Sequence, residues 1–228
     1  MRNTKLFMIR GLVFITLWLV SCDINSDIKI SSVDRQGIWG IDISHHQRYV
    51  NWNALVRYNK PDFVFLKCTE GTTHQDHKYA QYRKAAKKRN IIVGAYHFFS
   101  YTSPGKTQAY NFIKHAKLQK GDLIPVLDIE YKQHKTSNED IRKQVHEFCE
   151  VINKEYGQDP IIYCGYSFYK NVLKSEFSHF NYWIADYYRT PRRSYVFWQF
   201  TDSGYVEGIG KIDNNRLHPN KQLSDYML

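Results

Sequence analysis

The chain has 228 residues, 43% of them hydrophobic and 24% charged, which is the size and balance of one domain with a packed, soluble core. Its four cysteines form no CxxC pair and show no metal-finger spacing, which excludes a zinc finger. The formal net charge of +10 predicts attraction to an anionic polymer. Aromatic residues make up 16% of the chain, and such rings either build the core or stack on sugar faces.

The first residues have the pattern of a secretory signal peptide. Three basic residues, Arg2, Lys5 and Arg10, precede an apolar run over 11–20 that is too short to cross a bilayer comfortably. Removal of this segment takes away three basic and no acidic residues and leaves a net charge of +7. An exported basic protein is expected to meet a bacterial cell wall rather than nucleic acid.

The apolar run ends in Leu-Val-Ser-Cys, which resembles the lipobox of bacterial lipoproteins. In such proteins the cysteine, here Cys22, is lipidated and becomes the mature N-terminus. We therefore expect a lipoprotein signal peptide over 1–21 and a lipidated cysteine with a polar tether over 22–36. The protein is then exported and lipid-anchored to a bacterial membrane. A plain signal peptide or an uncleaved anchor is the alternative.

Three further cysteines, Cys68, Cys149 and Cys164, lie in the rest of the chain. Two of them fall in apolar, strand-like runs, so buried free thiols are expected. One disulfide among the three is the alternative in an oxidising compartment.

From Gly37 onward, short apolar runs alternate with amphipathic stretches, and one domain is expected over 37–228. Helices are predicted at about 75–89, 105–118 and 136–156, the last with a capping-box start. Alternating strands and helices predict an α/β barrel or a doubly wound sheet, and a short late connection favours an irregular barrel. Strands are predicted at Ile38–Ile43, Phe63–Lys67, Ile91–His97, Leu123–Ile129, Pro160–Cys164, Tyr182–Ala185, Tyr195–Phe200 and Gly210–Asp213.

Two acidic residues at the end of one predicted strand give the strongest local signal. In VLDIE (126–130), Asp128 and Glu130 are two positions apart, so on a strand they point to the same face. Their backbones would lie about 6 to 7 Å apart. Carboxylates this close cannot ionise independently, so one of them is expected to have a raised pKa. A protonated acid beside an ionised neighbour is what cleavage of a glycosidic bond requires.

Acidic and aromatic residues also gather at the ends of the other predicted strands. In α/β barrels the carboxyl ends of the strands form one rim, and active sites lie there. This accumulation favours an active site at that rim. The residues concerned are Asp42, Lys67, Glu70, Tyr96, His97, Trp183, Asp186, Trp198, Gln199 and Asp213.

Eight short motifs, in order along about 175 residues, resemble glycoside hydrolase family 25, the Chalaropsis-type lysozymes. Each motif alone is weakly specific, but the ordered set is highly specific and covers essentially the whole domain. None of the family's catalytic positions is replaced. The motifs are GIDISHHQ (40–47), FLKCTEG (65–71), GAYHFF (94–99), PVLDIE (125–130), IIYCGY (161–166), YWIADY (182–187), FWQF (197–200) and IGKIDNN (209–215).

The resemblance implies an irregular, flattened (β/α) barrel of about eight strands, similar to a TIM barrel. It implies hydrolysis of the β-1,4 bond between N-acetylmuramic acid and N-acetylglucosamine in peptidoglycan by a monomer, without a cofactor. Glu130 matches the general acid/base, and Asp128 matches the residue that orients the muramic acid acetamido group, the implied nucleophile. Further substrate-binding positions match Asp42, Glu70, Tyr96, Tyr163, Trp198 and Asp213.

Pairs of histidines, His45-His46 and His74 with His77, suggest metal ligands at first sight. Adjacent histidines on a loop point apart, however, and no third ligand at a suitable spacing is evident. No metal site is therefore expected.

Two other functions fit parts of the sequence. Chitinases of another family carry D-x-x-D-x-D-x-E at a strand end, but here the extra aspartates are replaced by Leu123 and Val126, which argues against a chitinase. The alternative to an enzyme is a lipid-anchored glycan-binding protein on an inactive lysozyme scaffold. Glu130→Gln separates the two, because binding should survive the substitution and hydrolysis should not.

Overall fold

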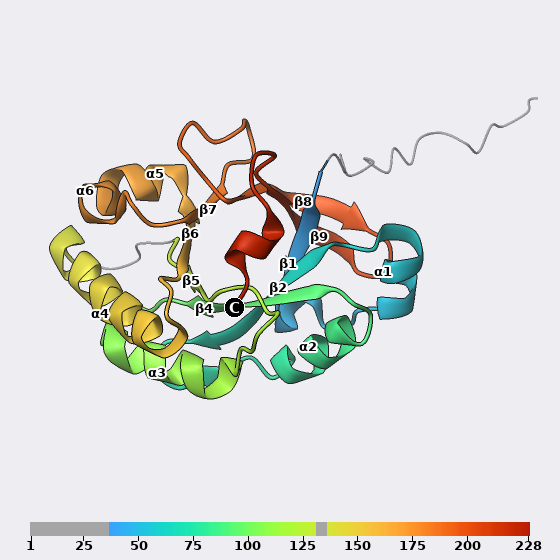
Figure 1. The fold of residues 1–228 in the computed structure, drawn as a ribbon, viewed down its shortest axis with the longest axis horizontal. Helices are drawn as coiled ribbons and strands as arrows, with labels where there is room; N and C mark the ends of the chain where they lie inside the picture. The colour runs from blue at the N-terminus through green and yellow to red at the C-terminus, as the bar shows by residue number, and fades with distance from the viewer. Residues whose placement is uncertain (1–36, 131–135) are drawn as a thin grey trace, which may run out of the picture. The chain divides into compact units, whose positions relative to one another are not determined.

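The computed structural model describes residues 37–130 and 136–228, in which eight strands close into a barrel (Figure 1). The strands follow the order β1-β9-β8-β7-β6-β5-β4-β2, and pairing of β1 with β2 closes the ring. A short strand, β3 (His74–Gln75), pairs with the end of β2. The barrel strands are β1 (Trp39–Ile43), β2 (Phe63–Glu70), β4 (Ile92–Phe98), β5 (Val126–Asp128), β6 (Ile161–Gly165), β7 (Tyr182–Ala185), β8 (Phe197–Val206) and β9 (Gly210–Leu217).

Strand direction divides the barrel into a regular and an irregular part. Neighbouring strands from β1 through β2, β4, β5, β6 and β7 to β8 are parallel, whereas β9 is antiparallel to both β8 and β1. A hairpin therefore joins β8 to β9, where a parallel crossover would need a longer connection. The predicted irregular α/β barrel of about eight strands is confirmed.

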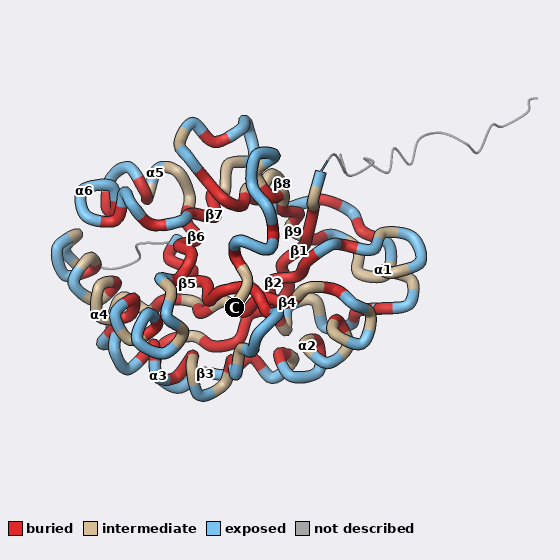
Figure 2. Tube along the Cα trace, in the orientation of Figure 1, coloured by how far each residue is buried: buried red, intermediate tan, exposed pale blue. Residues whose placement is uncertain are grey.

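Helices lie outside the barrel. In Figure 1, α2, α3 and α4 lie together along one side, while α5 and α6 lie beside β6 and β7. The strands are largely buried, and the outer faces of the helices are exposed (Figure 2). The α-helical segments are α1 (Trp52–Asn59), α2 (Tyr79–Lys87), α3 (Gly105–Ala116), α4 (Asn138–Tyr156), α5 (Tyr166–Phe168) and α6 (Lys174–Phe177), together with two 3-10 segments, η1 (His45–Gln47) and η3 (Leu223–Tyr226), and one π-helical segment, η2 (Tyr169–Leu173).

The longest helix, α4, begins and ends where its sequence signals predict. The Ser137 side chain accepts a hydrogen bond from the Asp140 backbone amide, and Gly157 has a left-handed φ of 71° just after the helix. The other two predicted helices are present as the shorter α2 and α3. The sequence signals do not predict α1 or the helical turns over 166–177, because these segments are too short to show a clear period.

Every second side chain along the strands fills the barrel interior. Phe63 and Phe65 of β2 contact Phe197 of β8, and Phe65 stacks on Trp183 of β7 at a ring-centroid distance of 4.5 Å. Gly94 of the neighbouring strand β4 leaves room for the Phe65 ring, because a Cβ atom at this position would lie only 2.4 Å from that ring. The interior is thus apolar in this layer, and the residues that follow along the same strands form the polar end of the barrel.

The three cysteines of the domain, Cys68, Cys149 and Cys164, are free and buried. Burial raises the pKa of all three thiols, so none of them is a reactive thiolate. The prediction of buried free thiols is confirmed.

The predicted signal peptide over 1–21 and the lipidated Cys22 with its tether over 22–36 lie outside the described residues. Within 37–130 and 136–228, no helix combines the length and apolar character needed to cross a bilayer.

Candidate active site

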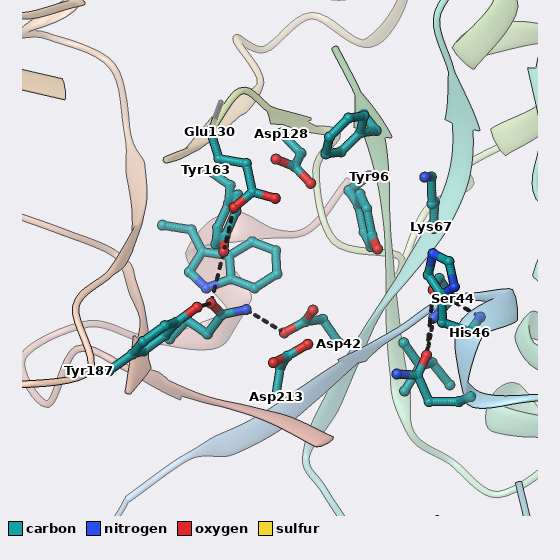
Figure 3. A pocket seen from close by; sticks show the side chains of 15 residues that line it. Asp42, Ser44, His46, Lys67, Tyr96, Asp128, Glu130, Tyr163, Tyr187 and Asp213 are labelled. Carbon is teal, nitrogen blue, oxygen red and sulfur yellow. Dashed lines mark hydrogen bonds between the residues drawn. The ribbon is translucent and has the colours of Figure 1, made fainter. Parts of the chain in front are cut away.

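A pocket lies at the carboxyl ends of the parallel strands (Figure 3). Its volume is about 290 Å³, near the lower end of the range of roughly 300 to 1,000 Å³ for small-ligand sites. Because β1 pairs with β9 in the closed barrel, residues from both ends of the domain line the pocket. Six of the eight predicted catalytic and substrate-binding residues line it, namely Asp42, Tyr96, Asp128, Glu130, Tyr163 and Asp213.

Asp128 is the last residue of β5 and is only 6% exposed. Burial, together with the charges of Glu130 and Asp42, raises the pKa of Asp128 well above its usual range. Its Oδ1 atom has no hydrogen-bond partner within the described part of the chain. Because buried polar atoms are normally hydrogen-bonded, this oxygen is an available acceptor for a ligand donor.

Glu130 lies two residues beyond Asp128, just after the strand, and lines the same pocket. The residue as a whole is exposed, but its carboxyl group points into the pocket (Figure 3). Partial burial of the carboxyl group and the charge of Asp42 raise the pKa of Glu130, while Tyr163 and Lys67 oppose this shift. An acid that keeps its proton and is still accessible suits general acid catalysis.

Asp42 and Asp213 form a second acidic pair, opposite each other on the antiparallel strands β1 and β9. Asp42 Oδ2 accepts hydrogen bonds from Asn215 Nδ2 at 2.7 Å and from Gln199 Nε2 at 3.0 Å. Burial nevertheless raises the pKa of Asp42. Burial and the neighbouring Asp42 charge raise the pKa of Asp213 to about 8. The pocket therefore holds four acids whose pKa values are all raised and which do not ionise independently of one another.

A hydroxyl network connects the two acidic pairs. Tyr163 and Tyr187 both donate to Gln199 Oε1, each at 2.8 Å, while the Gln199 amide donates to Asp42. The Tyr163 hydroxyl also lies 3.5 Å from Glu130 Oε2. Gln199 is thereby fixed as the centre of the network, and its orientation determines which groups can donate to each acid.

Lys67 is the only lysine or arginine among the described residues that line the pocket. Its Nζ donates to Glu70 Oε2 at 2.7 Å and lies 4.7 Å from the centroid of the Phe98 ring. Glu70 itself does not line the pocket. The structure therefore places Glu70 as the partner of Lys67 rather than as a lining residue, and Lys67 is the group that faces the acids.

Trp198 also lies away from the pocket, although the sequence argument places it in the groove. Side chains alternate along β8, so Phe197 and Gln199 point inward and Trp198 points outward. The Trp198 indole donates to the Asp186 carbonyl at 2.8 Å and lines a separate surface groove. Gln199 therefore lines the pocket in place of its aromatic neighbour Trp198.

The sequence argument misses Tyr187, which lines the pocket from the loop after β7. No periodic pattern marks a residue on such a loop, and only its place in the YWIADY motif could have indicated it. His46 and Gln47 of η1 also line the pocket, and they follow β1 in the same way.

The expectation of no metal site depends on the lack of a third ligand at a suitable spacing, and the fold brings one possible third group close. The structure brings His45 and His77 together with Asp76, and one possible ligand atom from each lies within 4.8 Å of the others. The spacing along the chain conceals this group because η1 and the segment after β3 meet only in the folded barrel.

The chain was compared with known proteins. Residues 41–209 match the family described as Glycosyl hydrolases family 25. The uncharacterized protein YegX of Escherichia coli K12 is 33% identical over 187 residues, covering 78% of this chain and 68% of YegX. The autolytic lysozyme of Clostridium acetobutylicum is 33% identical over 174 residues, covering 75% of this chain and 52% of that protein.

A solved structure of a family 25 glycosyl hydrolase from Bacillus anthracis is also similar. It is 31% identical, with a TM-score of 0.78, and the match covers 86% of this chain and 95% of that one. The family match includes Asp42, Asp128 and Glu130 of the acidic pocket, and Asp213 lies just beyond its end. The chain belongs to glycosyl hydrolase family 25.

Proposed function

We propose that this protein is a lysozyme that hydrolyses the β-1,4 bond between N-acetylmuramic acid and N-acetylglucosamine in peptidoglycan. The observation that carries the proposal is the pocket in which Asp128 and Glu130 lie together with raised pKa values. Membership of a glycosidase family and similarity to an autolytic lysozyme support the same activity. The net charge of +7 that remains after removal of residues 1–21 favours approach to an anionic wall.

Glu130 is the general acid in this proposal. Its raised pKa favours the protonated form of the carboxyl group, and its exposure gives the leaving sugar access to that proton. As the bond between C1 and the glycosidic oxygen breaks, the proton moves from Glu130 to that oxygen. The resulting carboxylate can then accept a proton from the water that completes hydrolysis.

Asp128 acts on the acetamido group of the muramic acid. The free Oδ1 acceptor can receive the acetamido N–H, which orients the acetamido carbonyl oxygen toward C1. That oxygen forms the bond to C1 as the leaving sugar departs, so the substrate itself supplies the nucleophile. This substrate-assisted route is a recognised exception to the scheme of two catalytic carboxylates.

The remaining polar residues of the pocket bind and position the sugar. Asp42 and Asp213 can accept hydrogen bonds from sugar hydroxyls, and the rings of Tyr96 and Tyr163 provide walls beside the acids. Burial and the charge of Asp42 raise the pKa of Tyr96 well above its usual range, so its hydroxyl remains a donor.

Mass spectrometry of the borohydride-reduced products of peptidoglycan digestion tests the bond that is cut. Muropeptides that end in reduced muramic acid are expected. Products that end in reduced glucosamine would mean a glucosaminidase on this scaffold. A complete lack of products, with retained binding to insoluble wall, would support the alternative of an inactive glycan-binding protein.

Substrate assistance is tested with N-deacetylated glycan. Without the acetamido carbonyl the nucleophile is lost, so deacetylated strands are expected to resist cleavage while the same strands, chemically re-acetylated, are cut. Equal rates on both substrates would contradict the role assigned to the acetamido group and leave the assignment of Glu130 open to its own test.

We also propose that Cys22 is lipidated after removal of residues 1–21, that 22–36 tether the domain to a bacterial membrane, and that the enzyme acts as a monomer. The Leu-Val-Ser-Cys sequence supports lipidation, and formation of the pocket by one chain supports a monomer. Cys22→Ser is expected to shift the protein out of the membrane fraction. Light scattering of the released protein is expected to give the mass of one chain.

A further inference from the structure

Four histidines and one buried aspartate, Asp76, lie close together beside the active site. The ring centroid of His45 lies 4.1 Å from that of His46, 5.4 Å from that of His77 and 6.3 Å from that of His74. Asp76, which contacts His45, is 1% exposed. These residues come from η1, from β3 and from the segment that follows β3. Two loops distant in sequence therefore present imidazole and carboxylate groups to the same point.

Three members of the cluster have the arrangement of a metal site. One ligand atom each from His45, Asp76 and His77 lies within 4.8 Å of the other two. Around a zinc ion with bonds of about 2.1 Å, tetrahedral ligand atoms lie about 3.4 Å apart. From separations of at most 4.8 Å, the group must contract by no more than about 1.4 Å to reach that geometry, which is within the rotation of one side chain. His77 is exposed and can make this movement.

Asp76 is already oriented for such a role. Its Oδ2 accepts from the His45 backbone N–H at 2.9 Å and lies 2.8 Å from His45 Nδ1, and its Oδ1 accepts from the Lys78 backbone N–H at 2.8 Å. The two backbone bonds alone would fix the η1 turn. They do not involve the second, exposed imidazole, His77, which has a ligand atom within 4.8 Å of the Asp76 carboxylate. A bound cation accounts for both observations.

The donor set selects the class of metal. Two imidazoles and one carboxylate are typical ligands of Zn²⁺, whereas Ca²⁺ and Mg²⁺ prefer sets made of oxygen atoms alone. We propose that His45, Asp76 and His77 bind one Zn²⁺ ion, with a fourth position left to water. His46 and His74 flank this position.

The proposed ion lies next to the catalytic pocket without belonging to it. The turn η1 that carries His45 also carries His46 and Gln47, which line the pocket (Figure 3). An ion held between η1 and Asp76 would tie this wall of the pocket to the segment between β3 and α2. Its role is therefore to hold the wall in place, and it takes no part in the cleavage step.

Equilibrium dialysis of the purified, untagged protein against micromolar Zn²⁺, followed by metal analysis, tests the proposal. The wild type is expected to bind one Zn²⁺ per chain, and His77→Ala is expected to weaken binding at least about 10-fold. His179→Ala is the matched control, because His179 is an exposed histidine on a different part of the surface, and it should bind as the wild type does. Mg²⁺ at the same concentration should not compete.

Thermal unfolding provides a second readout that does not depend on activity. Zn²⁺ is expected to raise the Tm of the wild type and of His179→Ala, and to leave the Tm of His77→Ala unchanged. The proposal is overturned if the wild type binds no Zn²⁺ at micromolar concentration, or if His77→Ala binds it as tightly as the wild type. It is also overturned if His74→Ala abolishes binding and His77→Ala does not.

Discussion

Two buried aspartates at opposite ends of one segment have contrasting surroundings. Asp122 lies just before the stretch that leads into β5, and Asp128 is the last residue of that strand. Asp122 is fully buried and lies 2.6 Å from both Arg83 Nη2 and Lys87 Nζ, and it accepts the Gln119 backbone N–H. Asp128 is almost as buried, yet one of its oxygens has no partner within the described residues, and acids surround it.

The difference separates an acid that stabilises the fold from an acid that is available for chemistry. Two cations and a backbone amide compensate the buried charge of Asp122, so its surroundings contribute to folding stability. The pocket holds Asp128 with neighbouring acids and one lysine, an arrangement that opposes ionisation. A fold keeps such an uncompensated group where function requires it.

The largest expected effect is that of Asp128→Asn. The side-chain amide keeps the shape of the carboxyl group but presents a different set of donors to the acetamido group, so the rate of peptidoglycan cleavage is expected to fall by about 100-fold or more. Tm should stay the same or rise, because a group with a raised pKa is replaced by a neutral one. Rate assays and calorimetry on the same preparation measure both. A fall in Tm with normal activity would show that Asp128 stabilises the fold and is not needed for cleavage, which is the opposite of its assigned role.

Asp122→Asn is expected to show the opposite pattern. Removal of the carboxylate leaves Arg83 and Lys87 without their partner, which should lower the free energy of unfolding by about 2 kcal/mol. This figure is below that for a fully buried pair because both cations are partly exposed. Denaturant unfolding measures the change. The cleavage rate per folded molecule should equal that of the wild type, and a large loss of rate would remove the distinction between the two aspartates.

A smaller effect is expected from Tyr163→Phe. The Tyr163 hydroxyl lowers the pKa of Glu130, so its removal should raise that pKa and shift the alkaline limb of the kcat/KM profile to higher pH. The rate should fall by about 10-fold because Gln199 also loses a hydrogen-bond donor. Tyr187→Phe is the matched control, since this hydroxyl bonds Gln199 but not Glu130. If the alkaline limb of the kcat/KM profile does not move in Tyr163→Phe, the effect of the Tyr163 hydroxyl on the pKa of Glu130 is contradicted.

The last effect concerns how folding stability depends on pH through Asp213. Its pKa is raised from 3.8 to about 8 in the folded chain, so the folded state holds this proton longer than the unfolded state does. Folding stability should therefore fall as pH rises between these values, with a slope of at most about 1.4 kcal/mol per pH unit from this group. Asp213→Asn should match the wild-type Tm at pH 4 and exceed it at pH 8. If the difference in Tm between the two proteins is the same at pH 4 and at pH 8, the raised pKa of Asp213 is contradicted.

Much of the fold and of the site could be predicted because both follow from strand periodicity. The alternation along β5 places Asp128 inward, and the order of strands in a barrel collects strand ends at one rim. The family resemblance assigns Trp198 to the groove, whereas the alternation along β8 assigns the inward position to its neighbour Gln199. Glu70 follows an irregularity in the pairing of β2 with β4 between Lys67 and Thr69, and no sequence signal marks that irregularity.

Other features depend on contacts between segments that are far apart in sequence. Tyr187 reaches the pocket from a loop, where neither a period of two nor a helical period applies. The meeting of His45 with Asp76 and His77 requires the turn after β1 to pack against the segment after β3. Such contacts form only when the barrel closes, and the hydrophobic periodicity of one segment does not predict which distant segment it will contact.

The central claim is that Glu130 supplies the proton for bond cleavage, and Glu130→Gln tests it most directly. The initial rate on purified peptidoglycan should fall by at least about 100-fold at the optimum pH of the wild type. Binding to insoluble wall and Tm should both match the wild type, because the amide keeps the size of the side chain and removes only the proton. A variant that binds wall normally and still cleaves it within about tenfold of the wild-type rate would contradict the account.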